Sequence, residues 1–207
     1  MASIETLTLE VADPTAAAHF YAALGLGDRV HLRASEAPTS GFRGYTLSLT
    51  VSQPGNVDRL VGAALDAGAT ALKPAAKSLW GYGGVVRAPD GAIWKVATSK
   101  KKDTAPASLA FDEIVLLIGA ADVAASKQFY VDRGLVVGKS FGRKYVEFAT
   151  PSSAVKLALY GRKALAKDAG VPIDGTGSHR LVLGSDAGPC TDPDGFVWEA
   201  AQPTPAP

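Results

Sequence analysis

Cysteine and long apolar runs are nearly absent from this sequence. Cys190 is the single cysteine among 207 residues, so the chain can form neither an internal disulfide nor a Cys-x-x-Cys zinc or redox pair. No apolar stretch approaches the roughly 20 residues that cross a bilayer, and the start, MASIETLTLE, lacks the basic and apolar regions of a signal peptide. We therefore expect a cytoplasmic protein without a membrane span.

An excess of either charge is also missing. Lysine and arginine together number 21, against 20 aspartates and glutamates, which gives a formal net charge of +1. Nucleic acids and anionic membranes attract strongly basic proteins, so neither is an expected partner. A near-neutral chain fits a small molecule as its ligand or substrate.

Two sequence motifs occur twice, in the same order. HFYAALGLG at 19–27 is echoed by QFYVDRGLVVG at 128–138, and APDGAIW at 88–94 is echoed by DPDGFVW at 192–198. Two motifs repeated at nearly the same offset indicate an internal duplication. We therefore divide the chain into a first half, 1–98, an exposed Lys-rich linker, 99–110, a second half, 111–202, and a Pro/Ala-rich tail, 203–207.

Hydrophobic residues in each half alternate between the period of a strand and the period of a helix. The first half predicts strands near 6–11 and 45–51, a helix that Asp13 caps and Gly25 ends, and a second helix that Gly68 ends. Further strands are expected at 69–75, 83–88 and 92–97. The second half predicts a helix near 121–133 and a short one at 162–169, with strands near 113–118, 136–141, 144–149, 155–160, 179–184 and 196–201.

These elements form four related units of a strand, a helix and further strands. The first and fourth units look shortened, because the fourth has no helix between its last two strands, whereas the second and third look complete. The complete units flank the linker. We therefore expect them to pair with each other and form one body across the two halves.

The doubled FY helices and PDG closing turns resemble those of the vicinal-oxygen-chelate superfamily, which includes glyoxalase I, bleomycin-resistance proteins and extradiol dioxygenases. The resemblance covers nearly the whole chain. It implies an α+β fold in which tandem βαβββ units form curled mixed sheets. In that family, the cup between paired units holds either a divalent metal with its substrate or a bound drug without metal.

Both motifs also have a local physical explanation. Each PDG suits a tight turn in which the glycine takes a positive φ. The aromatic pairs Phe20-Tyr21 and Phe129-Tyr130 lie on apolar helix faces, where packing on a sheet explains them. Trp94 and Trp198 are out of phase with the cup side of their strands and should pack beneath helices.

The resemblance implies metal ligands early in the first strand of a unit and near the end of its last strand. In the first half these points fall on Thr6, Thr46 and Lys95. A protonated lysine has no free lone pair, and threonine hydroxyls are poor ligands for a transition metal. We expect no metal in the first half.

In the second half the same points fall on Glu113, Ala158, His179 and Glu199. Two carboxylates and one imidazole would suit Mn, Fe, Ni or Zn, with positions left for water and substrate. Counting back from Asp122 would instead replace Glu113 by Val115. A purely structural role is equally open, since Glu199 could pair with a basic neighbour and His179 could cap a strand edge.

Aromatic residues suggest where a flat ligand could bind. Trp80 and Tyr82 lie in WGYGG ahead of the first closing turn, and a Trp-Gly at this place resembles the drug-binding members of the superfamily. Glycines allow close backbone approach, and the two rings offer stacking surface. Phe42 and Tyr45, which flank Arg43-Gly44, could form a second wall.

The sequence therefore supports a protein that binds a small hydrophobic or aromatic molecule in a cup without metal. The alternative is a metal-dependent lyase, isomerase or dioxygenase that uses Glu113, His179 and Glu199, so whether the protein is an enzyme stays open. A homodimer is a further expectation, because the shortened units could leave edges that a second subunit completes.

Overall fold

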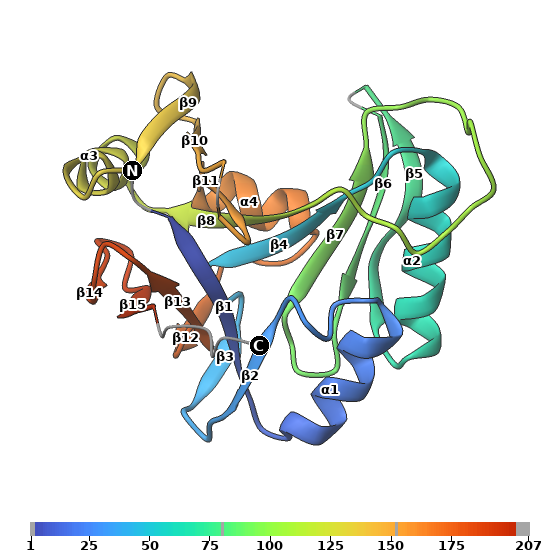
Figure 1. Ribbon diagram of the computed structural model, residues 1–207, viewed down its shortest axis with the longest axis horizontal. Coiled ribbons are helices and arrows are strands. Elements are labelled where there is room, and N and C mark those ends of the chain that lie inside the picture. Colours follow the sequence, from blue (N-terminus) through green and yellow to red (C-terminus); the bar gives the residue numbers. More distant parts are fainter. Residues whose placement is uncertain (1–2, 80, 152, 202–207) are drawn as a thin grey trace, which may run out of the picture.

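The computed structural model describes residues 3–79, 81–151 and 153–201, which form two curled sheets with four helices packed on them and one short two-stranded sheet (Figure 1). The helices are α1 Pro14–Ala23, α2 Pro54–Asp66, α3 Val123–Asp132 and α4 Arg162–Ala169. The strands of the first half are β1 Ile4–Val11, β2 His31–Ala34, β3 Thr39–Gly41, β4 Tyr45–Thr50, β5 Thr70–Ser78, β6 Gly81–Arg87 and β7 Ile93–Thr98. Those of the second half are β8 Glu113–Ala120, β9 Val136–Phe141, β10 Tyr145–Ala149, β11 Lys156–Gly161, β12 Gly175–Gly177, β13 Leu181–Ser185, β14 Cys190–Thr191 and β15 Val197–Ala200.

Two of the helices begin at aspartates in equivalent places of the two halves. The Asp13 carboxylate accepts hydrogen bonds from the amides of Thr15 and Ala16, at 2.9 and 3.0 Å. The Asp122 carboxylate does the same for α3. Each bond satisfies an amide that has no partner within the helix, so these caps fix where α1 and α3 start.

The larger sheet joins the two complete units. Its eight strands run in the order β5-β6-β7-β4-β8-β11-β10-β9, and the antiparallel pair β4–β8 at its centre places Leu47 opposite Leu116. Four strands come from each half of the chain. This pairing confirms the expectation that the units flanking the linker associate with each other.

The smaller sheet is built from the two shortened units, in the order β14-β15-β13-β1-β2. The fourth unit has no helix, and β13 leads through a turn to the two-residue strand β14 and then to β15. The strands β2, β3, β12 and β14 were not expected from the sequence. These strands are two to four residues long and mostly exposed, so they carry no alternating pattern.

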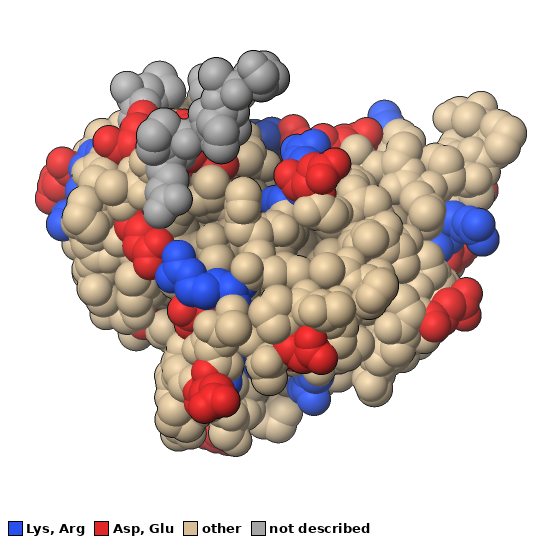
Figure 2. Space-filling model, turned by 60° about the horizontal axis from the view of Figure 1, so that its bottom comes forward, with Lys and Arg blue, Asp and Glu red and all other residues tan. Residues whose placement is uncertain are grey.

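The main core lies where α1, α2 and α3 cover the outer faces of both sheets. Trp94 and Trp198 are buried there, as expected, and pack against Tyr21 and Tyr130 with ring centroids 5.8 and 5.5 Å apart. No helix in the described part of the chain is both long and apolar enough to cross a membrane. On the face seen in Figure 2, acidic and basic side chains are interspersed and form no continuous patch of one sign.

The two repeated motifs contact each other across unit boundaries. The Tyr21 hydroxyl on α1 donates to the Asp90 carboxylate of the first closing turn at 2.6 Å, and the Tyr130 hydroxyl on α3 donates to Asp192 beside the second. Burial, reinforced by the neighbouring carboxylate, raises the pKa of both phenols well above the usual value, so both stay protonated as donors. The duplication therefore preserves a helix-to-turn contact as well as two separate elements.

The linker is held against the start of α2 by a buried amide side chain. Gln53 accepts from the amides of Thr104 and Ala105, both at 2.9 Å, and donates to the carbonyl of Ala105 at 2.8 Å. The Gln53 side chain is almost fully buried. It thereby orders a segment that has neither helix nor strand.

Gln53→Ala should release the linker. Three or more hydrogen bonds are lost and buried backbone groups lose their partner, so the free energy of unfolding should fall by about 1–2 kcal/mol. Trypsin should then cut faster at the lysines 100–102, which is measured by mass spectrometry of timed digests. Ser52→Ala, at an exposed neighbouring position, is the control, and equal cleavage rates for both variants would contradict the prediction.

Candidate functional site

The concave side of the eight-stranded sheet, called the large cup here, already contains α4. Leu165, Ala166 and Ala169 are buried in a second, smaller core with Phe42 and Ile93. The helix contacts β8, β4 and β11, and Figure 1 shows the sheet curling around it with α2 and α3 outside. The chain therefore fills part of its own cup.

The end of α4 is fixed by lysines from the sheet. Lys73 Nζ on β5 donates to the carbonyls of Lys167 and Asp168, at 2.8 and 2.6 Å. Lys95 Nζ on β7 lies 2.7 Å from the Asp168 carboxylate. The last carbonyls of a helix have no partner within it and carry partial negative charge, so cations stabilise this end.

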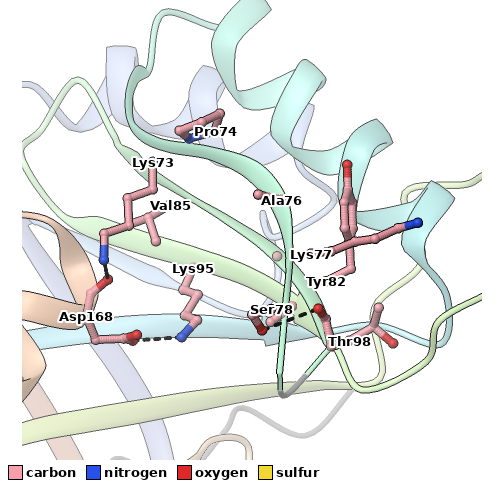
Figure 3. A pocket seen from close by; sticks show the side chains of 13 residues that line it. Lys73, Pro74, Ala76, Lys77, Ser78, Tyr82, Val85, Lys95, Thr98 and Asp168 are labelled. Atoms are coloured by element: carbon pink, nitrogen blue, oxygen red, sulfur yellow. Dashed lines mark hydrogen bonds and ion pairs between the residues drawn. The ribbon is translucent and has the colours of Figure 1, made fainter.

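Beside this end of α4 the large cup stays open, as a pocket of about 460 Å³. Figure 3 shows Lys73 and Lys95 directed toward Asp168 at one side of the pocket. Small apolar residues from β5, β6 and β7 complete the wall, among them Ala76, Val85 and Ala97. The pocket combines an apolar wall with charge at one end, which is typical of small-molecule sites.

The large cup does not fit a metal ion. At the points where the resemblance implies ligands it carries Thr46 on β4, Lys95 on β7, Ala158 on β11 and Glu113 on β8, and the Glu113 carboxylate is paired with Lys156. Lys95 is paired with Asp168, and its cross-strand neighbours are Ser48 and Val85. An ammonium group has no lone pair to offer and repels a cation.

One face of the five-stranded sheet carries Glu10 and Glu199 and is called the small cup here. On this face, an arginine side chain pairs with both carboxylates. The two terminal guanidinium nitrogens of Arg33, Nη1 and Nη2, each donate to one oxygen of Glu199 at 2.8 Å, and the Glu10 carboxylate lies 4.0 Å from the same guanidinium. The hydrogen bonds from Arg33 lower the pKa of the Glu199 carboxyl. The expected ligand Glu199 is therefore engaged in a bidentate ion pair.

His179 lies at the edge of the small cup with both ring nitrogens engaged. Nδ1 is 2.5 Å from the carbonyl oxygen of Arg43, and Nε2 is 3.1 Å from that of Asp194. The ring stacks on Phe196 with centroids 4.0 Å apart. Both nitrogens face main-chain carbonyl oxygens, so the imidazole links the loops that carry Arg43 and Asp194.

Glu113 lies on the other sheet, at the start of β8, where its carboxylate is 2.5 Å from Lys156 Nζ. The structure therefore does not assemble the expected metal centre of Glu113, His179 and Glu199. Among residues 3–79, 81–151 and 153–201, no group of three His, Cys, Asp or Glu side chains could hold a metal ion. Units 1 and 4 share one sheet and units 2 and 3 the other, which separates these carboxylates.

Of the expected aromatic contacts, Tyr82 is among the residues that line the pocket beside α4, whereas Phe42 and Tyr45 are not. Phe42 packs in the small core beneath α4, and Tyr45 packs on the opposite face of the sheet against Phe196; each is 2% exposed. The Tyr82 side chain turns toward α2, where its hydroxyl donates to Asp58 at 2.7 Å, and this bond raises the pKa of the phenol. Trp80 lies outside the described residues.

Alternation along its strand predicts that Lys95 lies on the cup side, but the sequence indicates Lys95 only as an unsuitable metal ligand. Lys73 and Asp168 were missed. A charged residue at a cup-facing strand position, as at Lys95, was the available signal. Nothing in the segment RKALAKDA shows that α4 enters the cup, because that placement depends on tertiary packing.

Comparison with solved structures identifies the fold. No protein-family profile matches the sequence, and no curated protein is significantly similar to it. Glyoxalase I from Zea mays superposes with a TM-score of 0.60 at 14% identity, over 96% of this chain and 91% of the maize chain. A "putative dioxygenase" from Bacillus subtilis gives a TM-score of 0.59 at 11% identity, over 98% and 86%. The chain thus has the fold of the vicinal-oxygen-chelate superfamily.

Proposed function

We propose that the protein binds a small, partly apolar molecule, without a metal ion, in the open part of the large cup. The observation that carries this proposal is the pocket of about 460 Å³ between α4 and strands β5 to β7. Its volume suits a molecule of one or two rings, and its wall of small side chains leaves room for a flat body.

The side chains at the implied ligand points, all of them among the described residues, support binding without metal. The large cup has Lys95 where a donor with a lone pair is needed, and in the small cup Arg33 engages both oxygens of Glu199. In each cup a basic side chain supplies the positive charge that a divalent ion would supply elsewhere.

Dye binding and elemental analysis test the two parts of this proposal. The neutral fluorophore N-phenyl-1-naphthylamine should bind the pocket, and Ala97→Phe, which fills it, should weaken binding by about tenfold or more. Ala71→Phe adds the same side chain at an exposed position of β5 and should leave the affinity unchanged.

Protein purified without chelator and then dialysed should contain no stoichiometric Mn, Fe, Ni or Zn. Equal dye affinities for the two phenylalanine variants would overturn the location of the site. A retained stoichiometric metal would overturn its metal independence.

A further inference from the structure

The charges of the large-cup pocket point to one class of ligand. Lys73, Lys77 and Lys95 line the pocket, and Asp168 is its one acidic residue, although the whole chain carries a net charge of only +1. In Figure 3 the Lys77 side chain turns away toward Tyr82, whereas Lys73 and Lys95 meet at Asp168. At the charged end of the pocket, Lys95 is therefore paired with the Asp168 carboxylate, and Lys73 is bound to the main-chain carbonyls of Lys167 and Asp168.

That carboxylate belongs to the helix inside the cup and not to the cup itself. Asp168 is the penultimate residue of α4, whereas the sheet side of this region presents Lys73 and Lys95 together with Ala76, Val85 and Ala97. Without Asp168, Lys95 would have no anionic partner among its described contacts.

The Lys95–Asp168 pair is also easy to exchange. Its two side chains are 34% and 41% exposed, so solvent screens their attraction and little free energy is lost when one carboxylate replaces another. Lys73 binds the main-chain carbonyls of Lys167 and Asp168 and would keep the helix end in place during such an exchange.

We propose that the ligand is an organic anion, with an apolar body and one carboxylate or sulfonate group, which takes the place of the Asp168 carboxylate on Lys95. The apolar body lies against Ala76, Val85 and Ala97. Asp168 is then an internal competitor that keeps Lys95 paired in the empty pocket. This inference rests on the proposed function and adds the charge of the ligand.

Two related dyes test it, because 1-anilinonaphthalene-8-sulfonate is N-phenyl-1-naphthylamine with one added sulfonate. Asp168→Asn should tighten binding of the sulfonated dye by about two- to fivefold, the factor that a partly exposed ion pair contributes, and leave the neutral dye unaffected. Lys95→Met should weaken the sulfonated dye by about tenfold, and Lys95→Arg should restore most of that loss.

A second ion pair on the same sheet provides the control. Glu113 and Lys156 are 41% and 39% exposed and lie outside this pocket, so Glu113→Gln and Lys156→Met should change neither affinity. An unchanged ratio of the two affinities in Asp168→Asn and Lys95→Met would overturn the anion preference while leaving the proposed pocket intact. Failure of both dyes to bind wild type and Asp168→Asn would overturn the proposed function and this inference together.

Discussion

Asp192→Ala is expected to lower the free energy of unfolding by about 3 kcal/mol and the melting temperature by about 6–12 °C. The Asp192 side chain is almost fully buried. It accepts hydrogen bonds from the Tyr130 hydroxyl and from the amides of Asp194 and Phe196, the latter two at 2.9 and 2.8 Å. Removing the carboxylate leaves three donors without a partner away from water. Thermal and urea unfolding measure the loss.

Asp192→Asn separates the contribution of the hydrogen bonds to stability from that of the negative charge. Burial is the main cause that raises the pKa of the Asp192 carboxyl above its ordinary value of 3.8. Because the folded-state pKa is the higher one, ionisation opposes folding above that pKa, and the opposition disappears as the pH falls through it. The asparagine keeps an oxygen for the two amides, so it should lose about 1 kcal/mol or less at neutral pH. Wild type should gain stability relative to it as the pH falls toward 3.8.

The first half of the chain shows what would contradict this prediction. There Ala88 stands in the position of Asp192, and Tyr21 donates to Asp90, the equivalent of Asp194. If the Asp194 carboxylate could accept the hydrogen bond of the Tyr130 hydroxyl in the same way, Asp192→Ala would lower the free energy of unfolding by less than about 1 kcal/mol. Asp194 already accepts from the Ala121 amide at 2.7 Å and the Ser126 hydroxyl at 2.5 Å, so we expect no such rescue.

Features set by local chemistry were predictable from the sequence. The caps Asp13 and Asp122 and the positive φ of 90° at both Gly91 and Gly195 follow from preferences of single residues. The duplication also showed which units are complete, and the β4–β8 pairing joins those two units as expected. Periodicity also placed Lys95 and Glu199 on the cup sides of their strands, because alternation along a strand needs no tertiary information.

Which side chains of different units meet at one site was not predictable from the sequence in the same way. The expected metal site took Glu113 from the third unit and Glu199 from the fourth, although pairing of units 2 and 3 leaves the fourth to pair with the first. These carboxylates therefore lie on different sheets and are neutralised by Lys156 and Arg33. Strand position decides which face a residue occupies, whereas the pairing of units decides which residues meet.

Leu165→Ala is expected to remove about 3 kcal/mol from the free energy of unfolding and to enlarge the space within the large cup. Leu165 is fully buried in the small core beneath α4. A helix of eight residues is not stable alone in water, so α4 depends on this burial for its place and its structure. The shorter side chain leaves a cavity on the concave face of the sheet. Urea unfolding measures the stability, and N-phenyl-1-naphthylamine titration measures the access to the cup.

Leu79→Ala is the matched control, because Leu79 is 85% exposed and its truncation should change stability by less than about 0.5 kcal/mol. Dye affinity should rise in Leu165→Ala and stay unchanged in Leu79→Ala, since only the first loosens the helix that fills the cup. A loss of less than about 1 kcal/mol in Leu165→Ala would mean that α4 is not packed against the sheet in solution. The whole cup would then be open to a ligand, and Asp168 could not hold Lys95.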